Sequence, residues 1–334
     1  MKRHPGPLST SACRSLAAAA LAAVIGACSP TATPPTVVPL AERVIAVLEM
    51  PGDPDWLIPG FGSMWVKRDD GNVVRMDPAT DDVVAIIDAD VTNPGLCQGI
   101  GADDTSIWAC SGPNIVRIDP ATNEVSDVVE AHKVYIQGRL VHESGRIWIL
   151  NGADAELLVG VDTETLEIGP PIALDAPCAD LAVGDGAIWA ICPRASLVLR
   201  IDPATRTVTD RIDVPDATQI SVGADAAWVV GSEGIVRIDL GDKSLTTVAV
   251  ATVVETGVWS NLDVVALWAG AASVWVRTRN PFLFRIDAAT SRIVETITAP
   301  EHGPGDIVGL GGTLWASDYT SGDGAVVHLR ADAR

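Results

Sequence analysis

Tryptophan recurs along this chain at intervals of 39 to 47 residues, and this spacing constrains the fold more than any other feature. Around each of seven tryptophans a tight turn precedes a short apolar run, and a segment similar to Arg-Ile-Asp-Pro-Ala-Thr follows. The seven are Trp65, Trp108, Trp148, Trp189, Trp228, Trp275 and Trp315. The clearest copy, residues 184–215, reads GDGAIWAICPRASLVLRIDPATRTVTDRIDVP. Self-similarity at a fixed period of roughly 20–50 residues indicates a repeat architecture.

Each copy has the pattern of four short β-strands. In the copy around Trp189, residues 180–183, 187–191, 197–201 and 208–214 are apolar or alternating, and turn residues separate them. A four-stranded repeat of this length is typical of a propeller blade. We therefore predict that residues 42–334 form an all-β, seven-bladed β-propeller of four-stranded antiparallel blades. The repeated tryptophans are assigned to its core.

One further strand pattern precedes the first copy. Residues 43–51, RVIAVLEMP, match the fourth strand of the sixth copy at residues 292–300, whereas the last copy ends before a fourth strand. We expect this N-terminal strand to pair in the last blade, because such closure removes the open edges of the array.

Arginine also repeats, two residues before the turn aspartate. We expect these side chains to be solvated or paired with acids on adjacent blades. They are Arg75, Arg117, Arg200, Arg237 and Arg285.

The N-terminus has the pattern of an export signal over residues 1–27. Basic residues precede an apolar run at residues 16–25, and small residues lead to Cys28. This resembles a bacterial lipobox, which implies cleavage before Cys28, a lipid on its thiol, and anchoring on the extracytoplasmic side of the membrane in the bacterial cell envelope. Simple secretion is one alternative; a transmembrane anchor is another, although spanning needs about 20 apolar residues. Residues 28–41, rich in proline and threonine, are predicted to be a tether.

The charge balance excludes several kinds of partner. The formal net charge is −20, so nucleic acid and anionic lipid surfaces are poor partners, since binding them depends on Lys and Arg. Apart from the membrane reached through lipid on Cys28, we expect an unknown small molecule, a peptide or a protein as partner. The ring itself is expected to be a monomer.

Four cysteines are predicted to form two disulfides. Cys97 and Cys110 are equidistant from one hairpin turn, and Cys178 and Cys192 from another. Residues equidistant from a turn face each other across a hairpin. We predict Cys97–Cys110 and Cys178–Cys192 bridges, favoured by an oxidising exterior.

A candidate site follows from the repeat register. The position nine residues before each tryptophan should lie at the start of an innermost strand, at the mouth of the central channel. It is chemically varied, whereas the next position is uniformly aliphatic. This variation is typical of a specialised mouth, although drift at a solvated position would look the same. The position holds Trp56, Gly99, Arg139, Asp180, Gln219, Ala266 and Asp306.

Loops after the tryptophan strands add further candidates at the same face. They contribute Arg194, Arg277, Arg279 and Tyr319, and the inserted Trp259 is expected over the rim. Arg139 with the three loop arginines would suit a carboxylate-bearing ligand. Asp180 and Asp306 would instead suit Ca²⁺, since carboxylate oxygens are its usual ligands. A divalent cation is therefore a possible cofactor, but the sequence does not assign a set of metal ligands.

A catalytic alternative rests on the segment that leads into the last copy. Glu301, His302 and Asp306 lie there, and His302 is the best candidate for a general base. No phosphate-binding loop, serine elbow or histidine metal cluster is present in the sequence.

The pattern from Gly184 through Trp189 to Arg200-Ile201-Asp202-Pro203-Ala204-Thr205 resembles YVTN/YncE-type propellers and the virginiamycin B lyase-like superfamily. The likeness covers nearly all of residues 43–330. It implies either an extracytoplasmic binding protein or a lyase that uses His and Glu residues with a metal in the channel. The catalytic set of the lyases has no full match here. We therefore expect a binding or scaffold protein, with a metal-dependent lyase or hydrolase as the alternative; convergence of His302, Asp306 and a third acid or histidine would favour the enzyme.

Overall fold

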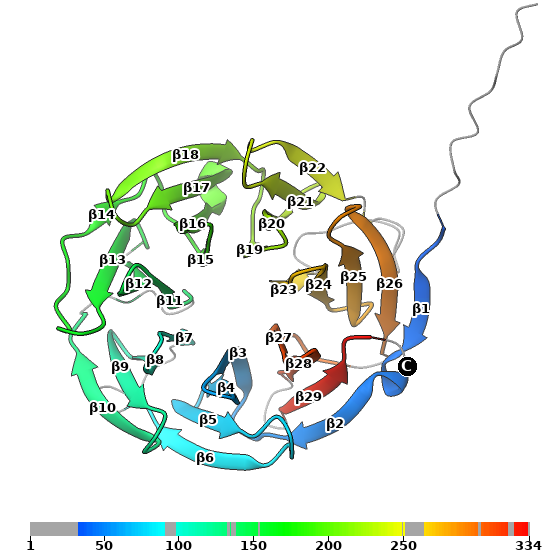
Figure 1. Cartoon of the computed structure of the whole chain (residues 1–334), viewed down its shortest axis with the longest axis horizontal. Coiled ribbons are helices and arrows are strands. Elements are labelled where there is room, and N and C mark those ends of the chain that lie inside the picture. The colour runs from blue at the N-terminus through cyan, green and yellow to red at the C-terminus, as the bar shows by residue number, and fades with distance from the viewer. Residues whose placement is uncertain are drawn as a thin grey trace, which may run out of the picture. The chain divides into compact units, whose positions relative to one another are not determined.

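Seven small sheets stand side by side in a ring, each with its first strand innermost (Figure 1). The computed structural model describes residues 33–90, 98–131, 134, 138–152, 154–248, 250, 264–299, 302–319 and 324–332. Within these residues each tryptophan copy is one blade, so the predicted seven-bladed β-propeller is confirmed. No helix in the described ranges is long and apolar enough to cross a membrane.

The strands of the first four blades follow one another in sequence order from the channel outward. Blade one contains β3 (Pro54–Gly60), β4 (Ser63–Arg68), β5 (Asn72–Met76) and β6 (Val83–Asp88). Blade two contains β7 (Ile100–Ala102), β8 (Ile107–Ser111), β9 (Asn114–Asp119) and β10 (Glu124–Val129). Blade three contains β11 (Val141–Glu143), β12 (Arg146–Asn151), β13 (Leu157–Asp162) and β14 (Ile172–Ala173). Blade four contains β15 (Asp180–Gly184), β16 (Ala187–Cys192), β17 (Leu197–Asp202) and β18 (Thr207–Asp213), with the short 3₁₀ turn η2 (Pro193–Ala195).

Blade five keeps the sequence order, whereas blades six and seven also include strands from the N-terminus. Blade five contains β19 (Gln219–Gly223), β20 (Ala226–Gly231), β21 (Gly234–Asp239) and β22 (Leu245–Val248). Blade six contains β23 (Val264–Ala269), β24 (Ser273–Thr278), β25 (Leu283–Asp287), β26 (Arg292–Thr298) and, outside them, β1 (Thr36–Pro39). Blade seven contains β27 (Ile307–Leu310), β28 (Thr313–Asp318), β29 (Ala325–Arg330) and β2 (Val44–Glu49), which follows the 3₁₀ turn η1 (Leu40–Glu42).

The repeated tryptophans form the core between blades. Each lies on the second strand of its blade and is at most 2% exposed. Consecutive residues of these strands are buried because neighbouring blades cover both faces, for example over all of Ala187–Cys192. The indole N–H of Trp189 donates to the Gly184 carbonyl at 3.3 Å, and Trp65 bonds Gly60 in the same way at 2.9 Å. The indole N–H therefore finds its hydrogen-bond acceptor within its own hairpin.

The repeated arginines stack on the repeated tryptophans. Arg75 is the direct cross-strand neighbour of Trp65, and its guanidinium carbon lies 5.0 Å from the ring centroid. The same pair recurs with Arg117, Arg200, Arg237 and Arg285 at 5.6–6.0 Å. The expectation of solvated or cross-blade arginines was therefore incomplete: residues opposite each other on neighbouring strands share a face, which brings the cation over the indole. In blade seven His328 occupies this position and stacks on Trp315 at 4.0 Å.

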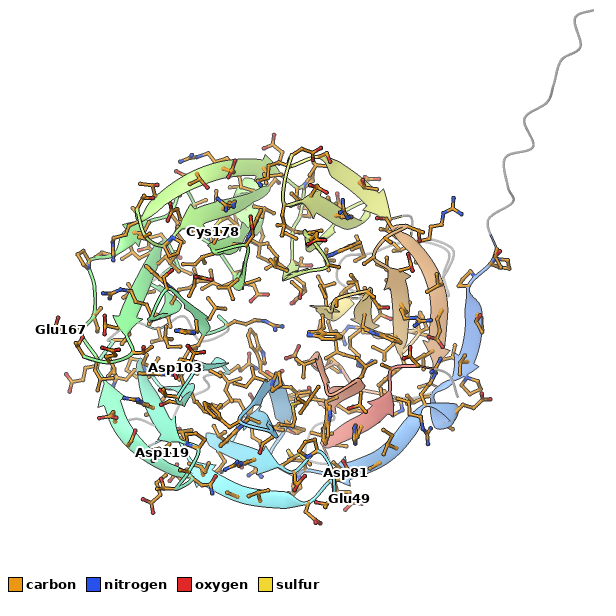
Figure 2. The ribbon with its side chains drawn as sticks, viewed as in Figure 1. Glu49, Asp81, Asp103, Asp119, Glu167 and Cys178 are labelled. Atoms are coloured by element: carbon orange, nitrogen blue, oxygen red, sulfur yellow. A yellow bond between two sulfur atoms is a disulfide. The ribbon has the colours of Figure 1, made fainter. Side chains whose placement is uncertain are left out.

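The aspartates in the turns between the third and fourth strands accept hydrogen bonds from the backbone of the same turn. Asp202 Oδ1 accepts the backbone N–H groups of Ala204 at 2.8 Å and Thr205 at 3.1 Å. These hydrogen bonds lower the pKa of Asp202. Asp119 makes the equivalent turn at the periphery of blade two (Figure 2), accepting the Ala121 N–H at 2.7 Å. Part of the negative charge of the chain therefore comes from aspartates that stabilise turns.

The N-terminal strand closes the ring as predicted. β2 pairs antiparallel with β29, and Val47 lies opposite Val327. Arg43, just before β2, forms a buried ion pair with Glu295 of β26 in blade six, and each side chain is 3% exposed. Segments more than 250 residues apart are thus joined by both a strand ladder and a buried charge pair.

The segment before β2 differs from the tether predicted for residues 28–41. Thr36–Pro39 forms β1, which pairs in parallel with β26, Val38 lying opposite Ile297. The apolar and β-branched residues of this stretch allow it to extend blade six by one strand. Residues 1–32, which include the predicted signal and Cys28, lie outside the described part of the chain.

One of the two predicted disulfides is confirmed. Cys178, which is labelled in Figure 2, is bonded to Cys192 in blade four, and their Cα atoms are 3.8 Å apart. Cys110 is also disulfide-bonded, and its predicted partner Cys97 is not among the described residues.

We predict that Glu295→Gln lowers the free energy of unfolding by about 3–5 kcal/mol, because it leaves Arg43 charged, buried and unpaired. Chemical denaturation at pH 7 measures the change. The control is Asp332→Asn, which removes a carboxylate that is 89% exposed and 3.5 Å from Arg285; it should change stability by less than about 1 kcal/mol. Equal effects of the two substitutions would contradict the role of the buried pair.

Candidate functional site

A cavity of about 340 Å³, with both polar and apolar walls, lies where the innermost strands begin. We call it the mouth cavity. Its walls come from all seven blades, each contributing one to three residues at or just before its first strand. They are Asp55, Trp56, Gln98, Arg139, Ala179, Asp180, Thr218, Gln219, Val265, Pro304, Gly305 and Asp306. A ring of blades places these short segments around one axis, so residues far apart in sequence meet there.

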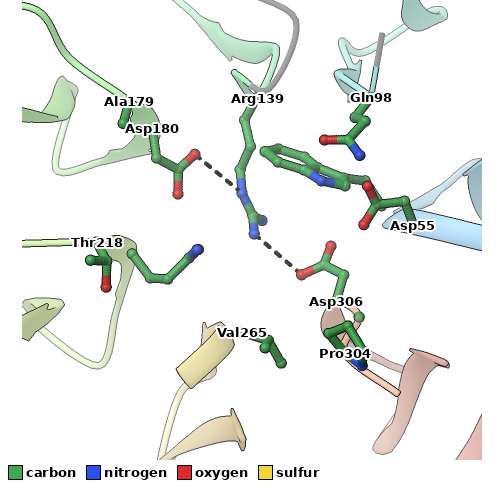
Figure 3. A pocket seen from close by; sticks show the side chains of 12 residues that line it. Asp55, Gln98, Arg139, Ala179, Asp180, Thr218, Val265, Pro304 and Asp306 are labelled. Atoms are coloured by element: carbon green, nitrogen blue, oxygen red, sulfur yellow. Dashed lines mark hydrogen bonds and ion pairs between the residues drawn. The ribbon is translucent and has the colours of Figure 1, made fainter. Parts of the chain in front are cut away.

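Arg139 stands at the centre of the mouth cavity, between two carboxylates (Figure 3). Its Nη2 donates to Asp306 Oδ1 at 3.2 Å, and its Nε lies 3.4 Å from Asp180 Oδ1. The guanidinium also covers the Trp56 ring, 4.6 Å from its centroid. Asp180 and Asp306 are each 4% exposed, whereas the Arg139 side chain is 20% exposed. Arg139 is therefore held by charge on two sides and by an aromatic face.

Backbone groups fix both carboxylates. Asp306 Oδ2 accepts the Leu57 N–H at 3.1 Å, which joins blade seven to blade one. Asp180 Oδ1 accepts the Leu181 N–H at 2.9 Å. The Cys178–Cys192 bridge lies two residues before Asp180 and ties the start of β15 to β16. These constraints limit movement of the carboxylates away from Arg139.

Two acidic oxygen positions in the mouth cavity remain without partners. The Asp55 carboxylate forms no hydrogen bond or ion pair with another described residue. Asp180 Oδ2 is buried and meets no donor with hydrogen-bond geometry, although the Ile220 N–H is near enough to lower the pKa of this carboxyl. The Thr218 hydroxyl is likewise buried without a partner in the described structure. Buried polar groups are normally bonded, so the Asp180 and Thr218 atoms need an explanation, whereas Asp55 is half-buried and faces the cavity.

Burial and neighbouring charges shift the pKa values of the site. Burial, together with the charges of Asp69 and Asp306, raises the pKa of Asp55 to about 7, and Arg139 offsets only part of this rise. Burial raises the pKa of Asp180 to about 6 against the opposing charge of Arg139. Burial alone would lower the pKa of Arg139, but Asp306 and Asp180 outweigh it and raise the pKa. Perturbed pKa values that cluster in a cavity are typical of functional sites.

A second, apolar cavity of about 190 Å³, the inner cavity, follows the mouth cavity. Five of the seven residues at the aliphatic position that follows the mouth register line it, together with neighbours on the same strands. Trp56 and Arg139 line both cavities. The stacked Trp56–Arg139 pair is therefore common to the walls of both cavities.

The structure brings together five of the residues that the sequence assigned to the mouth. Trp56, Arg139, Asp180, Gln219 and Asp306 all line the mouth cavity. Their assignment as ligand-binding residues remains a prediction.

The loop arginines do not join this group. Arg277 is fully buried and donates to the carbonyls of Thr278 at 2.8 Å and Gly303 at 2.6 Å, so its role is structural. Arg194 and Arg279 are exposed, and neither lines the mouth cavity. The four-arginine carboxylate site expected from the sequence is therefore not assembled. Tyr319 does not line the cavity either, and Trp259 falls outside the described ranges.

The catalytic candidates are not brought together. His302 Nδ1 lies 2.5 Å from Asp318 Oδ2, its ring packs edge-on against Phe282, and it does not line the mouth cavity with Asp306. Glu301 is not among the described residues. Within the described residues no group of three His, Cys, Asp or Glu side chains is arranged to hold a metal ion. Asp180 and Asp306, the candidate Ca²⁺ ligands, hold Arg139.

Asp55, Gln98 and Thr218 were missed by the sequence reasoning. Each lies ten residues before its tryptophan, one position before the register that was examined. Counting one position further would have found them, because the mouth cavity is lined almost entirely by these two positions of the repeat.

Solved structures share the fold at low sequence identity. Virginiamycin B lyase from Staphylococcus aureus matches with a TM-score of 0.67 and 16% identity, over 85% of this chain and 99% of that chain. The extracellular domain of a one-component system from B. thetaiotaomicron matches with a TM-score of 0.61 and 16% identity, over 86% of this chain and 43% of that one. U3-55K matches with a TM-score of 0.73 and 10% identity, over 87% and 99%. No family model and no curated protein matches the sequence.

These comparisons confirm the likeness to virginiamycin B lyase at the level of fold. Identities this low carry no statement about activity.

We predict that Asp55→Asn stabilises the protein at pH 8 by about 1–3 kcal/mol. The folded protein raises the pKa of Asp55 above its ordinary 3.8 and so binds this proton more tightly than the unfolded chain does. The contribution of Asp55 to stability must therefore fall as the pH rises from about 4 to 7. Denaturation curves from pH 3 to 9 should show the variant and wild type converging below pH 4. The exposed Asp104→Asn serves as control, and a destabilised Asp55→Asn at pH 8 would contradict the electrostatic account.

Proposed function

We propose that this protein is a lipid-anchored binding or scaffold protein of the bacterial cell envelope, which holds a small molecule in the mouth cavity without transforming it. The mouth cavity is the observation that supports the proposal most directly. All seven blades supply its walls, and it combines an aromatic face, a fixed guanidinium and unpartnered polar atoms. Ligand sites are typically such concave spaces with a few convergent polar groups.

The extracytoplasmic placement has three supports. The Cys178–Cys192 disulfide fits an oxidising compartment. One structural neighbour is an extracellular domain. The third support is the export pattern of residues 1–27, and the lipid anchor depends on the sequence around Cys28 alone.

Two observations favour binding over the lyase or hydrolase alternative. His302 is engaged by Asp318 instead of converging with Asp306. Asp180 and Asp306 are held against Arg139, so neither is free to take a substrate proton as a general base.

Cys28→Ser is expected to abolish lipid attachment, because the thiol is the acceptor that the lipobox-like pattern implies. Incorporation of radiolabelled palmitate and partition between membrane and soluble fractions measure this. Cys13→Ser, within the predicted signal, should leave both unchanged. Labelled, membrane-bound Cys28→Ser protein would rule out the anchor.

Binding in the mouth cavity is tested with a blocking variant. Ala179 lines the cavity, so Ala179→Phe should fill part of it, whereas Ala195→Phe adds the same ring on the exposed η2 turn. The assay measures thermal shifts with a panel of amines, carboxylates, monosaccharides and dipeptides. Compounds that raise the Tm of wild type should also raise the Tm of Ala195→Phe but not that of Ala179→Phe. Ligand at 100 times its Kd stabilises by about 2.7 kcal/mol. A shift that persists in Ala179→Phe would place the site elsewhere, and the lack of any shift would count against a small-molecule role.

A further inference from the structure

The charges in the mouth cavity do not balance. Three carboxylates, Asp55, Asp180 and Asp306, face one guanidinium among the described lining residues. Arg139 bonds Asp306 and lies beside Asp180, so Asp55 is the acid left without a partner. Asp69 lies close enough to raise the pKa of Asp55 further, and its own Oδ1 accepts the Gln98 amide at 3.4 Å. The Asp55 side of the cavity therefore carries the uncompensated negative charge.

An anionic ligand does not fit this arrangement. A carboxylate or phosphate is normally bound by the paired N–H donors of an arginine fork. Asp306 takes Nη2 of Arg139, and Asp180 lies against Nε. An anion that approached Nη2 or Nε would meet these acids, each of which is fixed to the backbone, by Leu57 N–H or Leu181 N–H.

A metal ion is also poorly matched. Ca²⁺ requires six to eight oxygen ligands that converge at about 2.3–2.6 Å. The described acids form no group of three with that convergence. An ammonium group needs only a few acceptors at about 2.7–3.0 Å, and these can come from separate walls.

Acceptors are present on separate walls. Asp180 is 4% exposed, and its Oδ2 meets no donor with hydrogen-bond geometry, although the Ile220 N–H is near enough to lower the pKa of the carboxyl. Asp55 is on blade one, on the side of Arg139 away from Asp180 in the view of Figure 3. Trp56, Val265 and Pro304 add apolar surface to the same walls. A small organic cation in the cavity would meet the Asp55 carboxylate and an apolar surface.

We propose that the mouth cavity binds a small organic cation, a protonated amine, whose ammonium group pairs with the Asp55 carboxylate. This inference rests on the proposed binding function and adds the chemical class of the ligand. Arg139 is a positioning residue in this scheme, because it neutralises Asp306 and holds the Trp56 face in place.

The binding should depend on pH through Asp55. The charged and titratable groups that act on it come from four other segments: Asp69 after β4, Arg139 before β11, Asp306 before β27 and Tyr319 after β28. The pKa of Asp55 near 7 leaves the carboxylate charged at pH 8 and mostly neutral at pH 5.5, where an alkylamine is still protonated. The affinity should fall by at least about tenfold between these pH values.

Three probes of equal chain length separate the ligand classes. Calorimetric titration at pH 8 compares 1,5-diaminopentane, 1,5-pentanediol and glutarate, with CaCl₂ as a fourth arm. We expect the diamine to bind and the diol and the diacid to bind at least about tenfold more weakly. Asp55→Asn should lose at least about tenfold in diamine affinity and lose its pH dependence, while Asp104→Asn should behave as wild type.

Each outcome decides between the proposals. Tighter binding of glutarate, equal binding of pentanediol, or binding of Ca²⁺ alone would overturn the cationic ligand. Diamine binding that survives Asp55→Asn, or fails to weaken at pH 5.5, would overturn the role of Asp55. If the broad panel gives hits that Ala179→Phe removes and none is an amine, the binding function stands and only this inference fails. If the panel gives no such hit, both fail.

Discussion

The tryptophan on the second strand of each blade, stacked against its cross-strand neighbour, is the contact on which the rest of the structure depends. In five blades that neighbour is arginine and in blade seven it is His328. Blade three departs from the rule, since Gly160 faces Trp148 and Arg206 of blade four reaches over the ring at 5.8 Å. A buried indole at the same height in every blade sets the spacing between blades, because interiors are close-packed. Equivalent residues of the repeats therefore lie at the same height along the channel, and the mouth is lined by one part of the repeat.

Closure converts this stack of blades into a rigid frame. β2 completes blade seven, and Arg43 pairs with Glu295 of blade six, so the first and last parts of the propeller share one edge. His328 adds a further link, because its Nδ1 lies 2.7 Å from Asp81 of blade one. A frame closed in this way can tolerate electrostatic strain at its centre. The Asp55 carboxylate is that strain, because burial and the charges of Asp69 and Asp306 disfavour its ionised form.

Much of the site could be predicted because the repeat register maps directly onto the mouth cavity. Counting nine residues back from the tryptophans found Trp56, Arg139, Asp180, Gln219 and Asp306, all of which line it. The loop arginines could not be placed in this way. Arg277 follows an apolar strand, and whether its side chain turns toward the channel or into the blade depends on carbonyls of Thr278 and Gly303 that no pattern reveals. The pairing of His302 with Asp318 depends likewise on how the chain leads into blade seven.

The amino-acid sequence alone determined the number of blades, the core position of each tryptophan, the N-terminal strand that closes the ring and the Cys178–Cys192 bridge. These features follow from short-range patterns, since turn residues, cross-strand neighbours and apolar alternation act within about 40 residues. Only the tertiary structure decided that β1 adds to blade six and that Arg139 neutralises Asp306, 167 residues away, while Asp55 remains unpaired. The physical reason is that the charge balance of the mouth depends on side chains from all seven blades and on how deeply each is buried. The chain acquires both this neighbourhood and this burial only when the ring closes.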